Sequence, residues 1–266
     1  MRLGAWIFLA LTLSGCTFAI NKLHDYRIDR AIMGGRYTPA FDLLNRTIDE
    51  DPDGPRALVA SRKGARVAHL EAKNYALAVK YYQHLVLRSE DPEERKTAQR
   101  FIAQIHFENL LDYNQAVTEY EKLLNLDVTP EEGFRYRLNL AKSHYSLNNL
   151  DQTLAELDTL LEKSPPADGV FEAKVLKANV FMTLKRLPEA ATLWQEILNE
   201  FPERSKKENV AMNLVVCYEE SKELGKAIDV LEKMRADYPN PEFLDIRIQR
   251  LKDRKLNLPG AQGFRK

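Results

Sequence analysis

The sequence repeats itself with a period of 37 or 38 residues. The segment 112–124 reads DYNQAVTEYEKLL, and similar segments occur at 74–86, 150–161 and 186–198. A small side chain recurs in these copies at steps of 38, 38, 37, 37 and 37 residues: Ala40, Ala78, Ala116, Thr153, Ala190 and Ala227. An internal repeat of this length is typical of folds in which similar supersecondary elements stack on one another.

Each copy carries the apolar spacing of an α-helix. Around Ala116, for example, large side chains stand three residues before and four and seven residues after, at Tyr113, Tyr120 and Leu123. Those offsets place side chains on one face of a helix. A second stretch with helical spacing precedes each copy, and no alternating run of strand length occurs. The sequence therefore predicts an all-α chain of helix-turn-helix repeats.

Prolines separate the repeats. Proline has no N–H to donate and its ring clashes with the preceding turn, so we expect each one to end a helix. These prolines are Pro52, Pro92, Pro130, Pro165, Pro202 and Pro239. We assign six repeats within residues 21–240, with the bounds 21–54, 55–92, 93–130, 131–166, 167–203 and 204–240. The apolar stripe of Leu244, Ile248 and Leu251 predicts a capping helix, which together with a tail accounts for residues 241–266.

The pattern resembles the tetratricopeptide repeat (TPR), a family whose usual period is 34 residues. The resemblance implies a right-handed superhelical solenoid of about six helix-turn-helix repeats plus the capping helix. In this family a small residue in the first helix of each repeat lets two helices approach closely. Ala141 and Ala178 fit, but Arg66 and Gln104 take the equivalent position in repeats two and three. We expect those two repeats to pack at different angles.

The N-terminal segment, MRLGAWIFLALTLSGC, is typical of an export signal. Arg2 precedes an apolar run that is too short to span a bilayer. The ending Leu-Ser-Gly-Cys resembles the lipobox of bacterial lipoproteins, which implies cleavage before Cys16 and lipidation of that cysteine. We therefore assign residues 1–15 to a signal peptide and residues 16–20 to the lipidated cysteine and a short tether. An ordinary secretory signal without lipid is the alternative.

The resemblance to bacterial lipoproteins also implies a location. Thr17 stands where enteric lipoproteins that stay in the inner membrane carry aspartate, so we expect the periplasmic face of the outer membrane. The lipobox together with six repeats resembles pilotin-type lipoproteins of type IV pili. The longer repeat is similar to that of β-barrel-assembly lipoproteins. The two resemblances leave the envelope pathway open.

Composition and motifs disfavour several function classes. The 39 basic and 39 acidic residues cancel, so the chain has no net charge to attract nucleic acid. The segment 49–54, DEDPDG, resembles the start of a calcium-binding EF-hand loop, but Ala60 stands where the closing glutamate is needed. The five histidines are spread over separate predicted helices. The sequence therefore predicts no cofactor, no metal and no enzyme activity.

The TPR resemblance implies that the first helices line a groove for an extended peptide or a helix of a periplasmic protein. Carried over position by position, the partner-binding residues are Lys63, Phe101, Ile105, Arg135, Leu138, Lys142, Tyr145, Asn179, Met182, Asn209, Met212 and Val216. The prediction is a lipid-anchored scaffold that supports assembly of an envelope complex, either a secretin or pilus, outer-membrane protein assembly or cell-wall machinery. A soluble peptide-binding or chaperone-like adaptor and an enzyme accessory subunit are the alternatives. The sequence predicts neither the partner's identity nor the oligomeric state.

Overall fold

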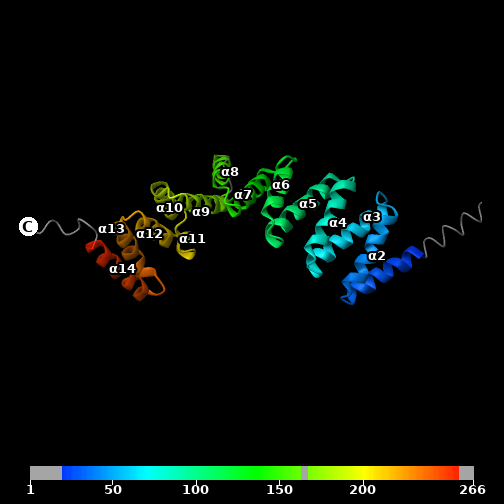
Figure 1. The fold of residues 1–266 in the computed structure, drawn as a ribbon, viewed down its shortest axis with the longest axis horizontal. Coiled ribbons are helices and arrows are strands. Elements are labelled where there is room, and N and C mark those ends of the chain that lie inside the picture. The colour runs from blue at the N-terminus through cyan, green and yellow to red at the C-terminus, as the bar shows by residue number, and fades with distance from the viewer. Residues whose placement is uncertain (1–19, 163–166, 258–266) are drawn as a thin grey trace, which may run out of the picture. The chain divides into compact units, whose positions relative to one another are not determined.

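The computed structural model describes residues 20–162 and 167–257. Regular structure within these ranges is helical throughout, and no strand occurs in them (Figure 1). The chain divides into two compact units, Met1–Leu126 and Asp127–Lys266, called unit 1 and unit 2 below. The predicted all-α class, with consecutive helices packed in tandem, is confirmed.

Unit 1 contains helix pairs in which each helix packs against the next. The first pair is a helix over residues 20–33 followed by α2 (Tyr37–Glu50). The elements that follow are α3 (Pro55–Arg66), η1 (Val67–Glu71), α4 (Tyr75–Arg88), α5 (Pro92–Gln104), η2 (Ile105–Asn109) and α6 (Tyr113–Leu124).

Unit 2 continues the pattern with one addition. A short helix, α11, stands between the fifth pair and the first long helix of the sixth. The elements of unit 2 are α7 (Pro130–Ser146), α8 (Leu150–Glu162), α9 (Ala167–Thr183), α10 (Leu187–Glu200), α11 (Pro202–Lys207), α12 (Val210–Glu220), α13 (Leu224–Met234), η3 (Arg235–Asp237) and α14 (Pro241–Leu256).

Several of the prolines that follow one helix also begin the next. Pro92, Pro130 and Pro202 are the first residues of α5, α7 and α11. Proline suits this position because the N–H that it lacks would have no partner in the first turn, and its fixed φ is already helical. As expected, each of the three stands past the end of the preceding helix; the structure adds that each also starts the next one. Pro165 lies outside the described residues.

One residue in the left-handed region closes the first helix of each repeat. These residues recur with the same steps as the sequence repeat: Gly35, Lys73, Leu111, Asn148, Lys185 and Lys222, with φ between 51° and 66°. A left-handed residue just past a helix lets the chain reverse and satisfies carbonyl groups of the last turn. The structural repeat therefore shows in the backbone as well as in the side chains, although glycine fills this position only once.

The first helices of repeats two and three end in a π-helical turn, which the sequence analysis did not anticipate. Ala72 N donates to Val67 O at 2.8 Å, and Leu110 N donates to Ile105 O at 2.9 Å, each spanning five residues. A π-helical turn accommodates one additional residue within a helix. The residues of the first helix that precede the π turn are therefore shifted by one position relative to the second helix of the same repeat.

This shift corrects the predicted small-residue positions. Ala65 and Ala103 are 1% and 0% exposed, as buried as Ala141 of repeat four, whereas Arg66 is exposed and Gln104 is partly exposed. The interval from Ala65 to Ala78 is thirteen residues, whereas in repeat four the interval from 141 to 153 is twelve. The π turn absorbs the difference, so repeats two and three keep a small residue where the helices cross.

The core cluster that joins α9, α10, α12, α13 and α14 of unit 2 includes Trp194 of α10, which is 0% exposed. Cys217 of α12 lies in the same core, where its Sγ–H donates to the carbonyl oxygen of Leu187 at 3.2 Å. Burial raises the pKa of the Cys217 thiol, so the thiol stays protonated and inert. Cys217 therefore acts as a small buried side chain.

Candidate functional site

We call the surface carried by α7, α9, α12 and α14 the first-helix face of unit 2. These are the first helices of repeats four to six together with the capping helix. Large apolar side chains are exposed on two of them: Val216 of α12 is 37% exposed, and Phe243 and Ile246 of α14 are 47% and 56% exposed. Exposed apolar groups set among charged ones are typical of a binding surface.

Ion pairs connect neighbouring first helices. Lys142 Nζ of α7 donates to Glu172 Oε2 of α9 at 2.9 Å. The hydrogen bond from Lys142 lowers the pKa of the Glu172 carboxyl below its ordinary value. In unit 1, Lys63 reaches Asp29 of the preceding first helix at 2.6 Å. Each pair joins two successive first helices of the same unit.

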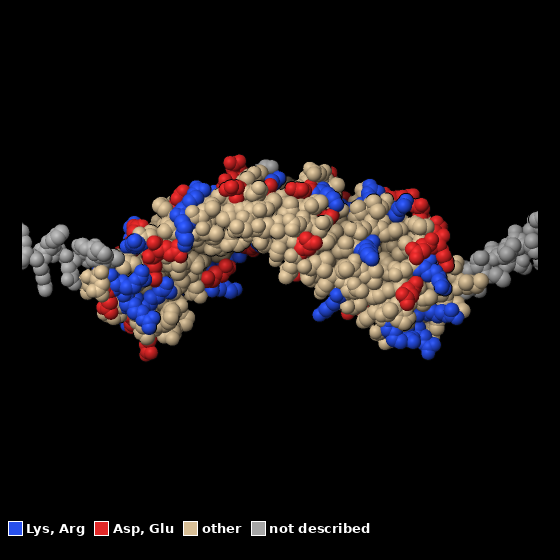
Figure 2. All heavy atoms as spheres, viewed as in Figure 1, with Lys and Arg blue, Asp and Glu red and all other residues tan. Residues whose placement is uncertain are grey.

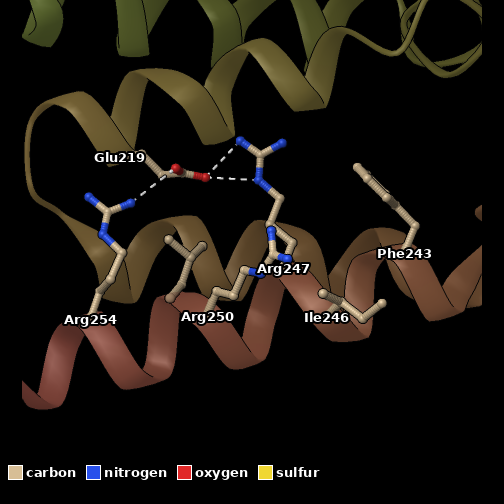
Figure 3. Close-up of a pocket in the computed structure, with 7 residues that line it drawn as sticks. Glu219, Phe243, Ile246, Arg247, Arg250 and Arg254 are labelled. Carbon is tan, nitrogen blue, oxygen red and sulfur yellow. Dashed lines mark hydrogen bonds and ion pairs between the residues drawn. The ribbon is translucent and has the colours of Figure 1, made fainter.

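A cavity of about 490 Å³ opens between α12 and α14. Figure 3 shows Glu219 of α12 between two arginines of α14, Arg247 and Arg254. Arg247 donates through Nε and an Nη to Glu219 Oε1 at 2.9 and 2.7 Å, and Arg254 donates to Oε2 at 3.4 Å. Arg250, Phe243 and Ile246 also line this cavity, which we call the cap pocket, and Leu251 completes the set.

The predicted partner-binding residues differ widely in exposure. Arg135, Asn209 and Val216 are exposed. The half-buried ones are Lys63, Phe101, Lys142, Tyr145, Asn179, Met182 and Met212. Nothing in the structure tests whether any of them binds a partner, and as a set they remain a prediction.

Two of the predicted residues are corrected by their burial. Ile105 is 0% exposed in the core of unit 1, because the π turn moves it from the surface register into the interior. Leu138 is 6% exposed and packs with Ala141 and Leu157 in the core beneath α7. Neither side chain offers a partner a usable contact area.

Asn209 lies in different surroundings from those predicted. Its φ of 53° breaks the first helix of repeat six into α11 and α12. Asn209 consequently lines a separate cavity of about 500 Å³ with Pro202, Lys206 and Tyr238. No feature of the helical periodicity distinguishes this break, because the residues on both sides favour helix.

Histidines make packing contacts rather than a convergent group. His69 packs against the rings of Tyr82 and Phe101, with centroid distances of 6.0 and 5.7 Å, and burial lowers its pKa. His84 hydrogen-bonds the Ser61 hydroxyl through Nδ1 at 2.9 Å. Within residues 20–162 and 167–257, no group of three or more His, Cys, Asp or Glu side chains has the arrangement of a metal site.

Among the helices that the structure describes, none has both the length and the apolar character needed to cross a membrane. The predicted signal peptide and Cys16 lie outside the described residues.

The sequence analysis missed the cap pocket. Arg247, Arg250 and Arg254 recur at helical spacing along the capping helix, so their common face was visible in the sequence. The position of Glu219 opposite them was not, because it depends on how α14 packs beside α12. Lys and Arg atoms gather over α14 in the space-filling view (Figure 2).

Comparisons with known proteins place the fold. Residues 138–205 match the model of the tetratricopeptide-repeat family. No curated protein matches the sequence.

Solved structures extend the likeness to most of the chain. PilW, a widely conserved type IV pilus biogenesis factor, is 13% identical with a TM-score of 0.53, over 86% of this chain and 98% of PilW. YrrB, a TPR protein with an unusual peptide-binding site, is 15% identical with a TM-score of 0.53, over 78% of this chain and 97% of YrrB. A TPR protein from Parabacteroides merdae is 15% identical with a TM-score of 0.51, over 88% and 87% of the two chains. The TM-scores show that these proteins share the fold of this chain, and at identities of 13–15% the likeness shows the fold alone.

Proposed function

Because the chain has the fold of a tetratricopeptide-repeat solenoid, we propose that it is a binding scaffold anchored by lipid on Cys16. A protein partner docks on the first-helix face, and the anchor holds both at the periplasmic face of a bacterial outer membrane. There the scaffold supports assembly of an envelope complex, such as a pilus or secretin, the outer-membrane protein assembly machinery or the cell-wall machinery.

The observation that carries the proposal is the make-up of the first-helix face. Val216 of α12 and Phe243 and Ile246 of α14 expose apolar area. Arg250 lines the cap pocket with Phe243 and Ile246 and makes no ion pair with any residue that the structure describes. Tandem repeats that stack in one direction offer such a face to an extended or helical segment of another protein. The printed descriptions of PilW and YrrB, a pilus biogenesis factor and a peptide-binding TPR protein, agree with this kind of role.

The helix over residues 20–33 supports the anchoring part of the proposal. Its first described residue, Ile20, stands four positions after Cys16 in the sequence, and its exposed side includes Leu23, Tyr26 and Met33 together with basic residues. Its acidic residues pair with α3: Asp25, which is itself exposed, with Arg56, and Asp29 with Lys63. A helix side of apolar and basic groups is suited to an anionic membrane surface.

One experiment with two variants tests both parts. Val216→Glu places a carboxylate in the proposed contact, and we expect at least about tenfold lower recovery of the partner from detergent-solubilised envelopes. That variant should remain in the membrane fraction. Cys16→Ser should move to the soluble fraction while it still captures the partner in solubilised extracts.

Gln152→Glu is the matched control, because Gln152 is exposed on α8, a second helix, and receives the same change of charge. It should behave as the unaltered chain in both readouts. Equal recovery by Val216→Glu and Gln152→Glu would refute docking on the first-helix face. Retention of Cys16→Ser in the membrane fraction would refute the lipid anchor.

A further inference from the structure

We propose that the cap pocket binds an acidic segment of a partner protein, in which a carboxylate and an apolar side chain share one face. The inference rests on the proposed scaffold function and adds the chemistry of the segment that docks. It concerns the pocket between α12 and α14, lined by Glu219, Phe243, Ile246, Arg247, Arg250, Leu251 and Arg254.

The charge of the pocket is unbalanced. Three guanidinium groups face one carboxylate, which leaves two positive charges in excess. Arg247 and Arg254 are both engaged with Glu219. Arg250 lies between them in sequence, is exposed, and makes no hydrogen bond or ion pair with any residue that the structure describes (Figure 3).

The pocket already shows how it receives a carboxylate. Arg247 binds one oxygen of Glu219 through two of its nitrogens, so the guanidinium fork is presented with its donors converging. Arg250 has the same guanidinium donors, and none of them is hydrogen-bonded to a residue that the structure describes. A second carboxylate, supplied by a partner, would meet a group whose charge is not yet neutralised.

Apolar surface adjoins this charge. Ile246 precedes Arg250 by one helical turn, about 6 Å along the axis, and is 56% exposed. Phe243, 47% exposed, precedes Ile246 by three residues on the same helix. Alternate residues of an extended segment stand about 7 Å apart on one face. An acidic residue on Arg250 would therefore place an apolar side chain of the same segment over Ile246 or Phe243.

Charge complementarity argues against residues 258–266 of the same chain as the occupant. This segment contains no Asp or Glu, and Arg265 and Lys266 carry the same charge as the arginines of the pocket. The exposed apolar side chains favour a peptide over a lipid headgroup, because a headgroup alone has no apolar side chain to cover Ile246 and Phe243. We therefore commit to an acidic peptide segment.

Fluorescence anisotropy of labelled peptides on the purified mature chain in neutral detergent tests the proposal. The probe is a short extended peptide of alternating glutamate and leucine, and the comparison peptides replace either glutamate with lysine or leucine with serine. We expect the glutamate–leucine peptide alone to bind well, with affinity that falls as salt is raised. Arg250→Gln should weaken this binding about tenfold, because it removes a charge-assisted hydrogen bond.

Lys252→Gln is the matched control on the same helix. Lys252 faces away from the pocket and pairs with Glu232 of α13 at 2.9 Å, so its loss should change peptide affinity less than about twofold. Both positions are exposed, and tryptophan fluorescence of each variant checks that unit 2 is folded.

In the binding assays with purified protein, three results would overturn the inference: equal effects of Arg250→Gln and Lys252→Gln, equal binding of the lysine peptide, or Arg250-dependent binding of anionic vesicles without binding of the peptide. The proposed scaffold function fails separately. If Arg250→Gln captures the envelope partner normally while Val216→Glu does not, the peptide chemistry assigned to the cap pocket is wrong and the scaffold stands.

Discussion

Replacement of Trp194 by alanine is expected to lower the free energy of unfolding of unit 2 by about 3–5 kcal/mol. Trp194 is 0% exposed and is the largest side chain among the fully buried ones. It packs in the core cluster that includes Phe171, Leu214 and Leu231, from three other helices. Its truncation leaves a cavity that these helices can only partly fill, so repeats five and six lose their common support.

Urea unfolding followed by far-ultraviolet circular dichroism measures this loss. Trp194→Phe is the control, since it keeps most of the ring volume and sacrifices no hydrogen bond: the indole Nε1 has no partner among the described residues. We expect the phenylalanine variant to lose well under half as much stability as the alanine variant. Similar, small losses for both variants would mean that Trp194 does not support the stack.

Replacement of Ile105 by alanine should cost about 2–5 kcal/mol, whereas Gln104→Ala should change stability by less than about 0.5 kcal/mol. Ile105 is 0% exposed and starts the π turn η2, while Gln104 is partly exposed and hydrogen-bonds Glu108 on the surface. The prediction depends on the π turn, because an uninterrupted α-helical register would exchange the roles of these two neighbours.

The same denaturation assay on the two single variants decides between the registers. Gln104→Ala serves as the control for Ile105→Ala, because the two positions are adjacent and the substituted residue is the same. A large loss for Gln104→Ala together with a small loss for Ile105→Ala would restore the register predicted from the sequence and exclude the π turn.

The repeated architecture could be predicted because it depends on local spacing. Ala116, Tyr120 and Leu123 fall on one face of a helix because of their spacing alone, and the same spacing occurs in every repeat. Helix existence and order followed from this spacing. The predicted class of fold was therefore secure without any knowledge of how the helices pack.

The register of repeats two and three could not be predicted in the same way. In each of these repeats the small residue of the first helix and that of the second helix are one residue further apart than in repeat four. The sequence alone does not show whether the additional residue lies in the connecting turn or within a helix. The π turns at Val67–Glu71 and Ile105–Asn109 take it up within the helix. Ile105 moved into the core as a result.

The cap pocket depends on tertiary packing that no local pattern encodes. The arginine face of α14 was visible in the sequence as a basic stripe. The structure adds that Glu219 pairs with both Arg247 and Arg254, whereas Arg250 makes no ion pair with any residue that the structure describes. Asn209 shows the same limit, since its left-handed conformation breaks a helix that its neighbours would otherwise continue.

Site-specific photo-crosslinking in cells that make the protein tests the central claim most directly. A photoreactive residue is placed at position 216 on the first-helix face or at position 152 on α8, both of which are exposed. We predict a discrete adduct with an envelope protein from position 216 and none from position 152. Adducts from position 152 alone, or the same adducts from both positions, would contradict a scaffold that holds its partner on the first helices.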